Sequence, residues 1–396
     1  MKNILIYTGF AKRYWSPKDY EERGIGGSET CAMFLAQEFK NKYPDMRVIV
    51  SGMVKDGTTG GVEYIGINNL SRVIDNTIFE VVIVSRYIHF FEFFPKYKSK
   101  LTYLWIHDTT VIGTKMDRGH LSREEIPYFK AILSHIDSII CLSPWHKDYF
   151  ISCFPFAKDK IKIIGNGLVT RGFRSLAKPK IKNKFIYTSC AVRGLDILLD
   201  LWPRIKERLS DASLDIFTYE DFPRSNNLLE MEISRKLQFL DKLEVKHHGS
   251  LPQHKLHDIL QSCDYWLYPC RFCETFCITS MEMQYARVLN ISSNLAALDT
   301  TVADRGILVN LGQGIESKQF QDTILKELFH ITENLTKKNE LLDSAERWAQ
   351  SQTWDKKIEE WIELMSDGHV TPQAAGPQEK QNIIKYNFNT GKLYLC

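Results

Sequence analysis

No stretch of this sequence approaches the roughly 20 consecutive apolar residues that a membrane-spanning helix needs. It also has no block rich in lysine and arginine, and its formal net charge of +3 is close to balance for 396 residues. Without a basic stripe that follows phosphates, a nucleic-acid partner is not expected. The apolar run at residues 4–7 is too short for the core of a signal peptide. We therefore expect a first buried strand there, in a chain that works in the cytoplasm.

An Asp-x-Asp pair, which would chelate a divalent cation, is also absent, so we expect neither a metal ion nor a cofactor. The sequence has nine cysteines, an odd number, and we expect them to be reduced, buried thiols. Cys270, Cys273 and Cys277 have a spacing seen in metal and iron–sulfur sites, but a fourth ligand is lacking. Four histidines, at positions 247, 248, 254 and 257, are expected to be solvated on a strand end and a separate helix rather than to gather around a metal.

Length and composition predict two globular domains. The chain is too long for one ordinary core, and its 44% hydrophobic and 25% charged residues are typical of a soluble protein. Apolar, Val- and Ile-rich runs predict strands at residues 3–8, 47–51, 62–65, 79–85, 101–107, 138–142, 161–164, 185–188, 214–218, 245–248, 265–268, 289–292 and 307–309. Helices are predicted at residues 28–41, 123–135, 144–154, 194–209, 226–242, 254–262, 276–286 and 317–334. This alternation predicts an α/β protein with two Rossmann-like, doubly wound parallel sheets that face a central cleft.

The domain boundaries follow from composition. Residues 1–168 form the expected N-terminal domain, and the basic stretch 169–184, with few apolar residues, is the expected linker. Residues 185–345 form the second domain. A helix over residues 346–365 closes the globular part and is a candidate to pack back on the first domain. Residues 366–396 read as a tail with room for a short hairpin at 383–386 and 393–395.

The first candidate ligand loop contains Gly26 and Gly27, which open a helix. Glycines allow a ligand to approach the backbone closely, and a helix N-terminus offers unpaired N–H groups. The spacing differs from the dinucleotide pattern G-x-G-x-x-G, and no acidic residue ends the second strand, so NAD is disfavoured. The plain alternative is a turn that simply requires glycine.

The second candidate is a pair of carboxylates, Glu274 and Glu282, eight residues apart around a helix start. Eight helical residues span about 12 Å, on the order of the distance from a hexose to a ribose across one diphosphate. The N–H groups of the intervening segment, at Thr275, Phe276, Cys277 and Ile278, would point at that diphosphate. Two glutamates on a helix often mark a solvated face instead, but the apolar residues around this pair favour burial.

The third candidate is Arg193, followed by Gly194 at the start of a helix. A guanidinium beside a helix N-terminus is suited to stabilise a leaving diphosphate. The alternative is a surface arginine without a ligand.

Together these motifs resemble glycosyltransferase family 4, the group-1 family of retaining enzymes with the GT-B fold. The resemblance covers residues 1–365. Glu274 and Glu282 are similar to the family's E-x7-E signature, and Gly26-Gly27 to its glycine loop. Asn166-Gly167 resembles the pair near the family's hinge, and residues 304–309 resemble its D-x-G stretch.

The resemblance implies a metal-independent transfer of a sugar from a UDP- or GDP-sugar to a glycan, lipid-linked or protein-linked acceptor, with retained anomeric configuration. Glu274 would bind sugar hydroxyls, Glu282 the ribose diol, and Arg193, in place of the family's usual lysine, the diphosphate. His107 matches the family histidine that touches the donor sugar, although a lone histidine is often only structural. His107, Arg193 and Glu274 are thus the residues implied to be catalytic, and the N-terminal domain is implied to hold the acceptor.

Two departures from the family pattern concern the phosphate site. The G-R-L triplet that supplies a second cation is Tyr187-Thr188-Ser189 here, which leaves Arg271 as a candidate replacement. The glycine that follows the family's phenylalanine is Cys277, whose Cβ narrows the approach of a phosphate.

Three other interpretations stay open. The chain could be another nucleotide-sugar enzyme, such as a 2-epimerase, or a non-catalytic protein that binds nucleotide sugars. Residues 87–100 combine four phenylalanines with three lysines and are a candidate for peripheral membrane contact, with a core-packed helix as the alternative.

Overall fold

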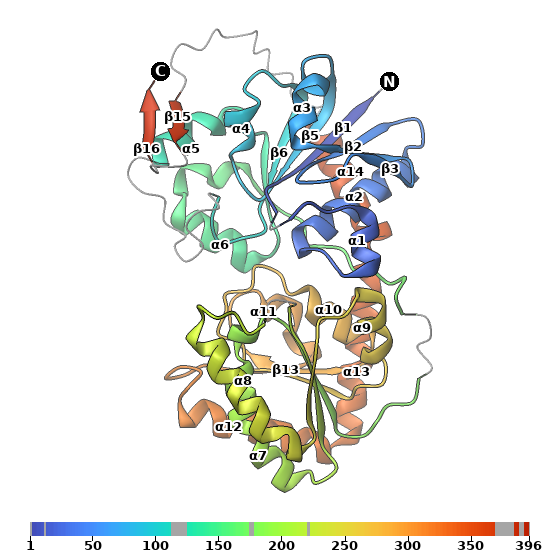
Figure 1. The fold of residues 1–396 in the computed structure, drawn as a ribbon, viewed down its shortest axis with the longest axis vertical. Helices are drawn as coiled ribbons and strands as arrows, with labels where there is room; N and C mark the ends of the chain where they lie inside the picture. The colour runs from blue at the N-terminus through green and yellow to red at the C-terminus, as the bar shows by residue number, and fades with distance from the viewer. Residues whose placement is uncertain are drawn as a thin grey trace. The chain divides into compact units, whose positions relative to one another are not determined.

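The computed structural model describes residues 2–11, 13–111, 125–173, 178–219, 222–368, 384–387 and 392–395. The chain is an α/β protein with one large sheet in each of two compact units (Figure 1). The N-terminal unit comprises Met1–Pro17, Ile25–Gly165 and Trp354–Cys396, and the C-terminal unit comprises Lys18–Gly24 and Asn166–Thr353. The predicted α/β class with two mainly parallel sheets is confirmed.

The sheet of the N-terminal unit has the strand order β3-β4-β2-β1-β5-β6-β7-β8. Its strands are β1 Asn3–Gly9, β2 Arg47–Gly52, β3 Gly57–Thr59, β4 Val62–Gly66, β5 Ile78–Ser85, β6 Lys98–Trp105, β7 Ser138–Cys141 and β8 Ile161–Ile163. All neighbours are parallel except β3 and β4, which are antiparallel. Consecutive residues of β1, from Ile4 to Ile6, are fully buried, as expected for a strand covered on both faces.

The helices of this unit are α2 Gly27–Lys42, α3 Ile67–Ile74, α4 Phe90–Phe93, α5 Glu125–Leu133, α6 Pro144–Cys153 and α14 Trp354–Gly368, with the 3-10 turn η1 Pro155–Lys160. Helix α6 begins as predicted, because the Ser143 side chain accepts a hydrogen bond from the His146 N–H and Pro144 occupies the first turn. The predicted start of the helix at 123–135 lies outside the described residues.

The single helix predicted over residues 346–365 is wrong. The chain instead forms α13 Leu335–Ser351 and α14, because it leaves the helical path at Gln352, whose carbonyl accepts a hydrogen bond from the Leu168 N–H at 2.7 Å. Helix α14 then packs against α2. Its Trp361 also packs against Trp105 at the end of β6, and the centroids of the two buried rings are 5.1 Å apart.

The C-terminal unit has a fully parallel sheet with the order β11-β10-β9-β12-β13-β14. Its strands are β9 Lys184–Thr188, β10 Ser213–Phe217, β11 Val245–Gly249, β12 Tyr265–Tyr268, β13 Leu289–Ser293 and β14 Ile307–Val309. Its helices are α1 Pro17–Glu22, α7 Leu195–Arg208, α8 Leu228–Leu240, α9 Gln253–Leu260, α10 Ile278–Tyr285, α11 Leu298–Thr301, α12 Lys318–Glu333 and α13, with 3-10 turns η2 Ala191–Arg193, η3 Asp241–Leu243 and η4 Ala303–Arg305. Figure 1 shows α7, α8 and α12 on one side of β13 and α9, α10 and α13 on the other.

A two-stranded antiparallel hairpin, β15 Ile384–Asn387 and β16 Lys392–Leu395, is present within the predicted tail. Much of that tail lies outside the described residues. None of the helices in the described part of the chain combines the length and apolarity that crossing a membrane requires.

Candidate functional site

Arg193 and Glu274 form an ion pair in the C-terminal unit. Arg193 ends η2, which follows β9, and Glu274 lies in the loop between β12 and α10. Nη1 of Arg193 donates a 2.8 Å hydrogen bond to Oε1 of Glu274, and the Tyr268 hydroxyl donates to the same oxygen at 2.9 Å. Burial, the largest single effect, acts to lower the pKa of Arg193, but Glu274 and the other acidic groups around it together outweigh burial and raise that pKa. Two predicted residues that are 81 positions apart thus meet beyond the carboxyl ends of neighbouring strands, where open α/β sheets bind ligands.

Gly194 explains how Arg193 reaches this position. Its φ of 126° lies in the region that residues with a side chain rarely adopt. A Cβ atom at this position would fall 1.9 Å from the carbonyl oxygen of Pro269. The backbone after Arg193 therefore lies directly against the loop that carries Glu274, and only glycine permits this approach.

The segment between the two predicted carboxylates is largely buried. Thr275, Phe276 and Cys277 are each less than 10% exposed, and Ile278 is half-buried at the first position of α10. Cys277 precedes the helix with extended backbone, and its side chain forms no capping hydrogen bond. Burial, followed by the charge of Glu274, raises the pKa of the Cys277 thiol well above its usual value, so this thiol stays protonated. The first-turn N–H groups of α10 are therefore not capped by the residue that precedes them.

Glu282 is buried on α10 and is held by two side chains from α9. Nε2 of His257 lies 3.1 Å from Glu282 Oε1, and the Gln253 amide donates to the same oxygen. The prediction that all four histidines of residues 247–257 are solvated is thus wrong for His257, which is fully buried. Gln253 and His257 are four residues apart, so they share one face of α9, and this face meets Glu282 of α10.

Arg271, the candidate for a second phosphate cation, is engaged elsewhere. Its guanidinium donates to Asp196 on α7 at 2.6 Å and lies 3.3 Å from Glu316. Two carboxylates already balance this cation, so a phosphate would have to compete with them.

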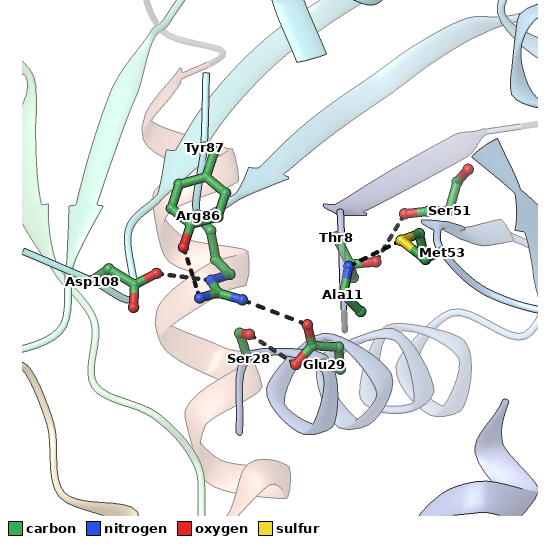
Figure 2. A network of polar contacts seen from close by, with 9 residues as sticks. All are labelled: Thr8, Ala11, Ser28, Glu29, Ser51, Met53, Arg86, Tyr87 and Asp108. Atoms are coloured by element: carbon green, nitrogen blue, oxygen red, sulfur yellow. Dashed lines mark hydrogen bonds and ion pairs between the residues drawn. The ribbon is translucent and has the colours of Figure 1, made fainter. Parts of the chain in front are cut away.

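The N-terminal unit gathers charged side chains around its own strand ends. Gly26 precedes α2 and Gly27 is its first residue, so the predicted glycine loop opens this helix. Figure 2 shows Arg86, which follows β5, between Glu29 of α2 and Asp108 beyond β6. Its Nε donates to Asp108 at 2.8 Å, and its Nη1 lies 3.7 Å from Glu29. The φ of Arg86 is 73°, an uncommon conformation for a residue with a side chain, which this network fixes.

His107 lies next to this network, two residues after the end of β6. Its ring packs on Trp105, with centroids 4.3 Å apart. Burial, followed by the charges of Arg86 and His146, lowers the pKa of His107 well below its usual value. The imidazole is therefore neutral at physiological pH and able to donate or accept a hydrogen bond.

Several features predicted from the sequence lie apart from these sites. Three of the four phenylalanines in residues 87–100, Phe90, Phe91 and Phe94, are buried in the core of the N-terminal unit. The segment thus follows the core-packed alternative, and most of the apolar side chains that membrane contact would need are turned inward. Within the described ranges, no group of three His, Cys, Asp or Glu side chains is placed to hold a metal ion.

Four residues of these two sites were not predicted from the sequence, because the sequence signals for them were weak. Arg86, Gln253 and His257 belong to no motif, and Tyr268 reads only as an apolar strand residue. The spacing of Gln253 and His257 is the one local pattern that could have indicated a shared polar contact.

No family model matches the chain. It is 22% identical over 222 residues to the GPI3 subunit of phosphatidylinositol N-acetylglucosaminyltransferase from Saccharomyces cerevisiae, a match that covers 49% of this chain and 48% of that protein. The chain thus matches about half the length of its curated relatives.

Solved structures match nearly the whole chain. A glycosyltransferase from Rickettsia africae is 14% identical with a TM-score of 0.68, and the match covers 93% of this chain and 99% of that one. HepE of Anabaena, in complex with UDP-glucose, is 13% identical with a TM-score of 0.67 over 93% of this chain and 100% of that one. These likenesses confirm the GT-B fold, whereas membership of family 4 stays a prediction.

Proposed function

We propose that this chain is a glycosyltransferase that moves a hexose-type sugar from a UDP- or GDP-sugar to a hydroxyl acceptor, with retention of configuration. The observation that carries the proposal is the Arg193–Glu274 pair, which stands with Glu282 around the start of α10. The fold supports it, because solved structures with this fold include glycosyltransferases and a complex with UDP-glucose.

In the proposed donor site, Arg193 binds the diphosphate together with first-turn N–H groups of α10. A guanidinium forms bidentate hydrogen bonds with phosphate oxygens, and a helix N-terminus favours negative charge. Glu274 accepts hydrogen bonds from sugar hydroxyls, and Glu282 from the ribose diol. The sequence has no Asp-x-Asp pair, so we assign charge neutralisation to these groups and propose a reaction without a metal ion.

The proposed chemistry begins with cleavage of the bond between the anomeric carbon and the phosphate oxygen. The bonding electrons leave with the nucleoside diphosphate, whose growing negative charge Arg193 stabilises. The acceptor hydroxyl attacks the anomeric carbon from the face that the phosphate leaves, and its proton passes to the departing phosphate. A double displacement would need a carboxylate nucleophile, a role to which we assign no residue. Neutral His107 is proposed to hydrogen-bond the donor sugar.

A lipid-linked or glycan acceptor fits this proposal. The yeast relative is named for transfer to phosphatidylinositol, which supports an acceptor with a lipid anchor. A hydrolysing 2-epimerase would release the nucleoside diphosphate without an acceptor, and a silent binding protein would not release it at all. Release of nucleoside diphosphate that depends on added acceptor therefore distinguishes the three functions.

The experiment that tests the donor site is titration calorimetry of UDP and GDP with Glu282→Ala. Loss of hydrogen bonds to a charged carboxylate should weaken the nucleotide that the wild type prefers by about 10- to 100-fold. Glu207→Ala, an exposed carboxylate on α7, is the control and should bind as the wild type does. Unchanged affinity and turnover in Glu282→Ala would contradict the assignment.

A further inference from the structure

The buried carboxylate of Glu282 meets both of its protein partners through one oxygen. His257 and Gln253 both contact Oε1, while no hydrogen bond to Oε2 is found among the described residues. An ionised carboxylate accepts about two hydrogen bonds at each oxygen. The two α9 side chains therefore fill Oε1 and leave Oε2 open for a ligand.

The imidazole of His257 is also held in place on the sides that do not face Glu282. Phe173 stacks on it with ring centroids 4.0 Å apart and an interplanar angle of 12°. Gly172 passes so close that a Cβ there would lie 2.3 Å from Nδ1. Nδ1 is buried with no hydrogen-bond partner among the described residues, so a proton on Nδ1 would have no acceptor. The proton therefore belongs on Nε2, where it points at Glu282.

We propose that His257 and Gln253 are positioning residues that fix the rotamer of Glu282, so that its Oε2 recognises the ribose diol of the donor. This inference rests on the proposed function, in which Glu282 binds ribose. Neither residue touches the ligand. Each residue restricts the rotamers of the Glu282 side chain, so that less conformational entropy is lost when the carboxylate binds the two hydroxyls.

The test compares nucleotides with and without the diol. Calorimetry measures the affinities of UDP and GDP and of their 2′,3′-dideoxy forms, and the ratio of the two affinities reports the diol contact alone. For the wild type we expect a ratio on the order of tenfold or more. In His257→Leu and Gln253→Met the ratio should fall several-fold, with little change for the dideoxy nucleotide.

Three further variants separate positioning from packing. Gly172→Ala leaves both side chains that bind Glu282 unsubstituted, but it should lower the ratio, because its new Cβ displaces the His257 ring. His257→Gln, which can still donate a hydrogen bond, should recover part of the ratio. Lys255→Met changes an exposed residue of the same helix and should behave as the wild type.

Each outcome decides a different point. A wild type that binds ribose and dideoxy forms equally, or binds neither UDP nor GDP, removes the donor assignment and this inference with it. If the wild type prefers the ribose form over the dideoxy form and the variants show the same preference, the inference is overturned and the donor assignment stays intact. Variants that weaken both forms by the same factor show a merely structural role and overturn the inference as well.

Discussion

Replacing Glu274 by glutamine should strengthen the binding of UDP while it slows transfer. In the free protein this carboxylate accepts a 2.8 Å hydrogen bond from Arg193, the cation proposed to bind the diphosphate. The carboxylate therefore repels the diphosphate and competes for its partner. Glu274→Gln keeps the shape of the side chain, and its amide oxygen still accepts from the Tyr268 hydroxyl, but the charge is gone.

The size of the effect follows from Coulomb's law. A phosphate on the far side of the same guanidinium would lie about 6 Å from the carboxylate, which gives about 3 kcal/mol of repulsion at an effective dielectric constant of about 20. The Arg193 side chain is 29% exposed, so solvent screens part of this energy. We expect about 1 kcal/mol, or roughly fivefold tighter binding of UDP.

Turnover should move in the opposite direction. If Glu274 binds the sugar hydroxyls as the bond breaks, loss of its charge should lower kcat/KM for transfer by about 10- to 100-fold. Calorimetry with UDP and a transfer assay with the preferred nucleotide sugar measure the two effects separately. The control is Glu333→Gln, because Glu333 pairs with Arg208 at the same 2.8 Å on the exposed surface. Weaker or unchanged UDP binding in Glu274→Gln would refute the placement of the diphosphate on Arg193.

Two further predictions concern stability. Gly194→Ala should destabilise the chain by at least about 3 kcal/mol, because the new side chain is strained at a positive φ and overlaps Pro269. Thermal unfolding measures this loss. The control is Gly57→Ala, which should be neutral because the space around its Cβ is open. For His146, burial lowers the pKa from about 6.5 to about 4, so the unfolded chain binds a proton between these values that the folded chain does not. Stability should therefore fall as pH drops through this window, by about 2 kcal/mol at pH 5 relative to pH 7. Urea unfolding of His146→Gln should lack this part of the pH dependence, and an identical dependence in both proteins would contradict the assignment to His146.

The central strands could be predicted from the sequence because they are buried on both faces. Such strands read as unbroken apolar runs, as in β1 and β12, and every strand predicted in this way is present. The strand β3 was missed because all three of its residues are exposed, so it has no apolar pattern. The break between α13 and α14 was missed because it depends on a backbone contact with Leu168, far away in the sequence.

The candidate site divides in the same way. Short sequence motifs contain Arg193, Gly194 and Glu274, and the spacing of these motifs indicates their chemistry. The ion pair between Arg193 and Glu274, however, joins positions far apart in the sequence. His257 gave no such signal, because its role depends on which face of α9 meets α10. Only the packed structure decides that face, so the contact between His257 and Glu282 could not be foreseen.

Of the two differences from the family pattern at the phosphate site, the cysteine at position 277 matters less than the sequence suggests. The missing second cation matters more. Cys277 has a φ of −89° and extended backbone, a conformation open to any residue, so the backbone at this position does not require glycine. Arg271, the candidate replacement for that cation, is already bound to Asp196 and Glu316 in the described part of the chain. A diphosphate in this site would therefore depend on Arg193 and on the N-terminus of α10. That dependence is the reason why the charge of Glu274, hydrogen-bonded to Arg193, should control affinity so directly.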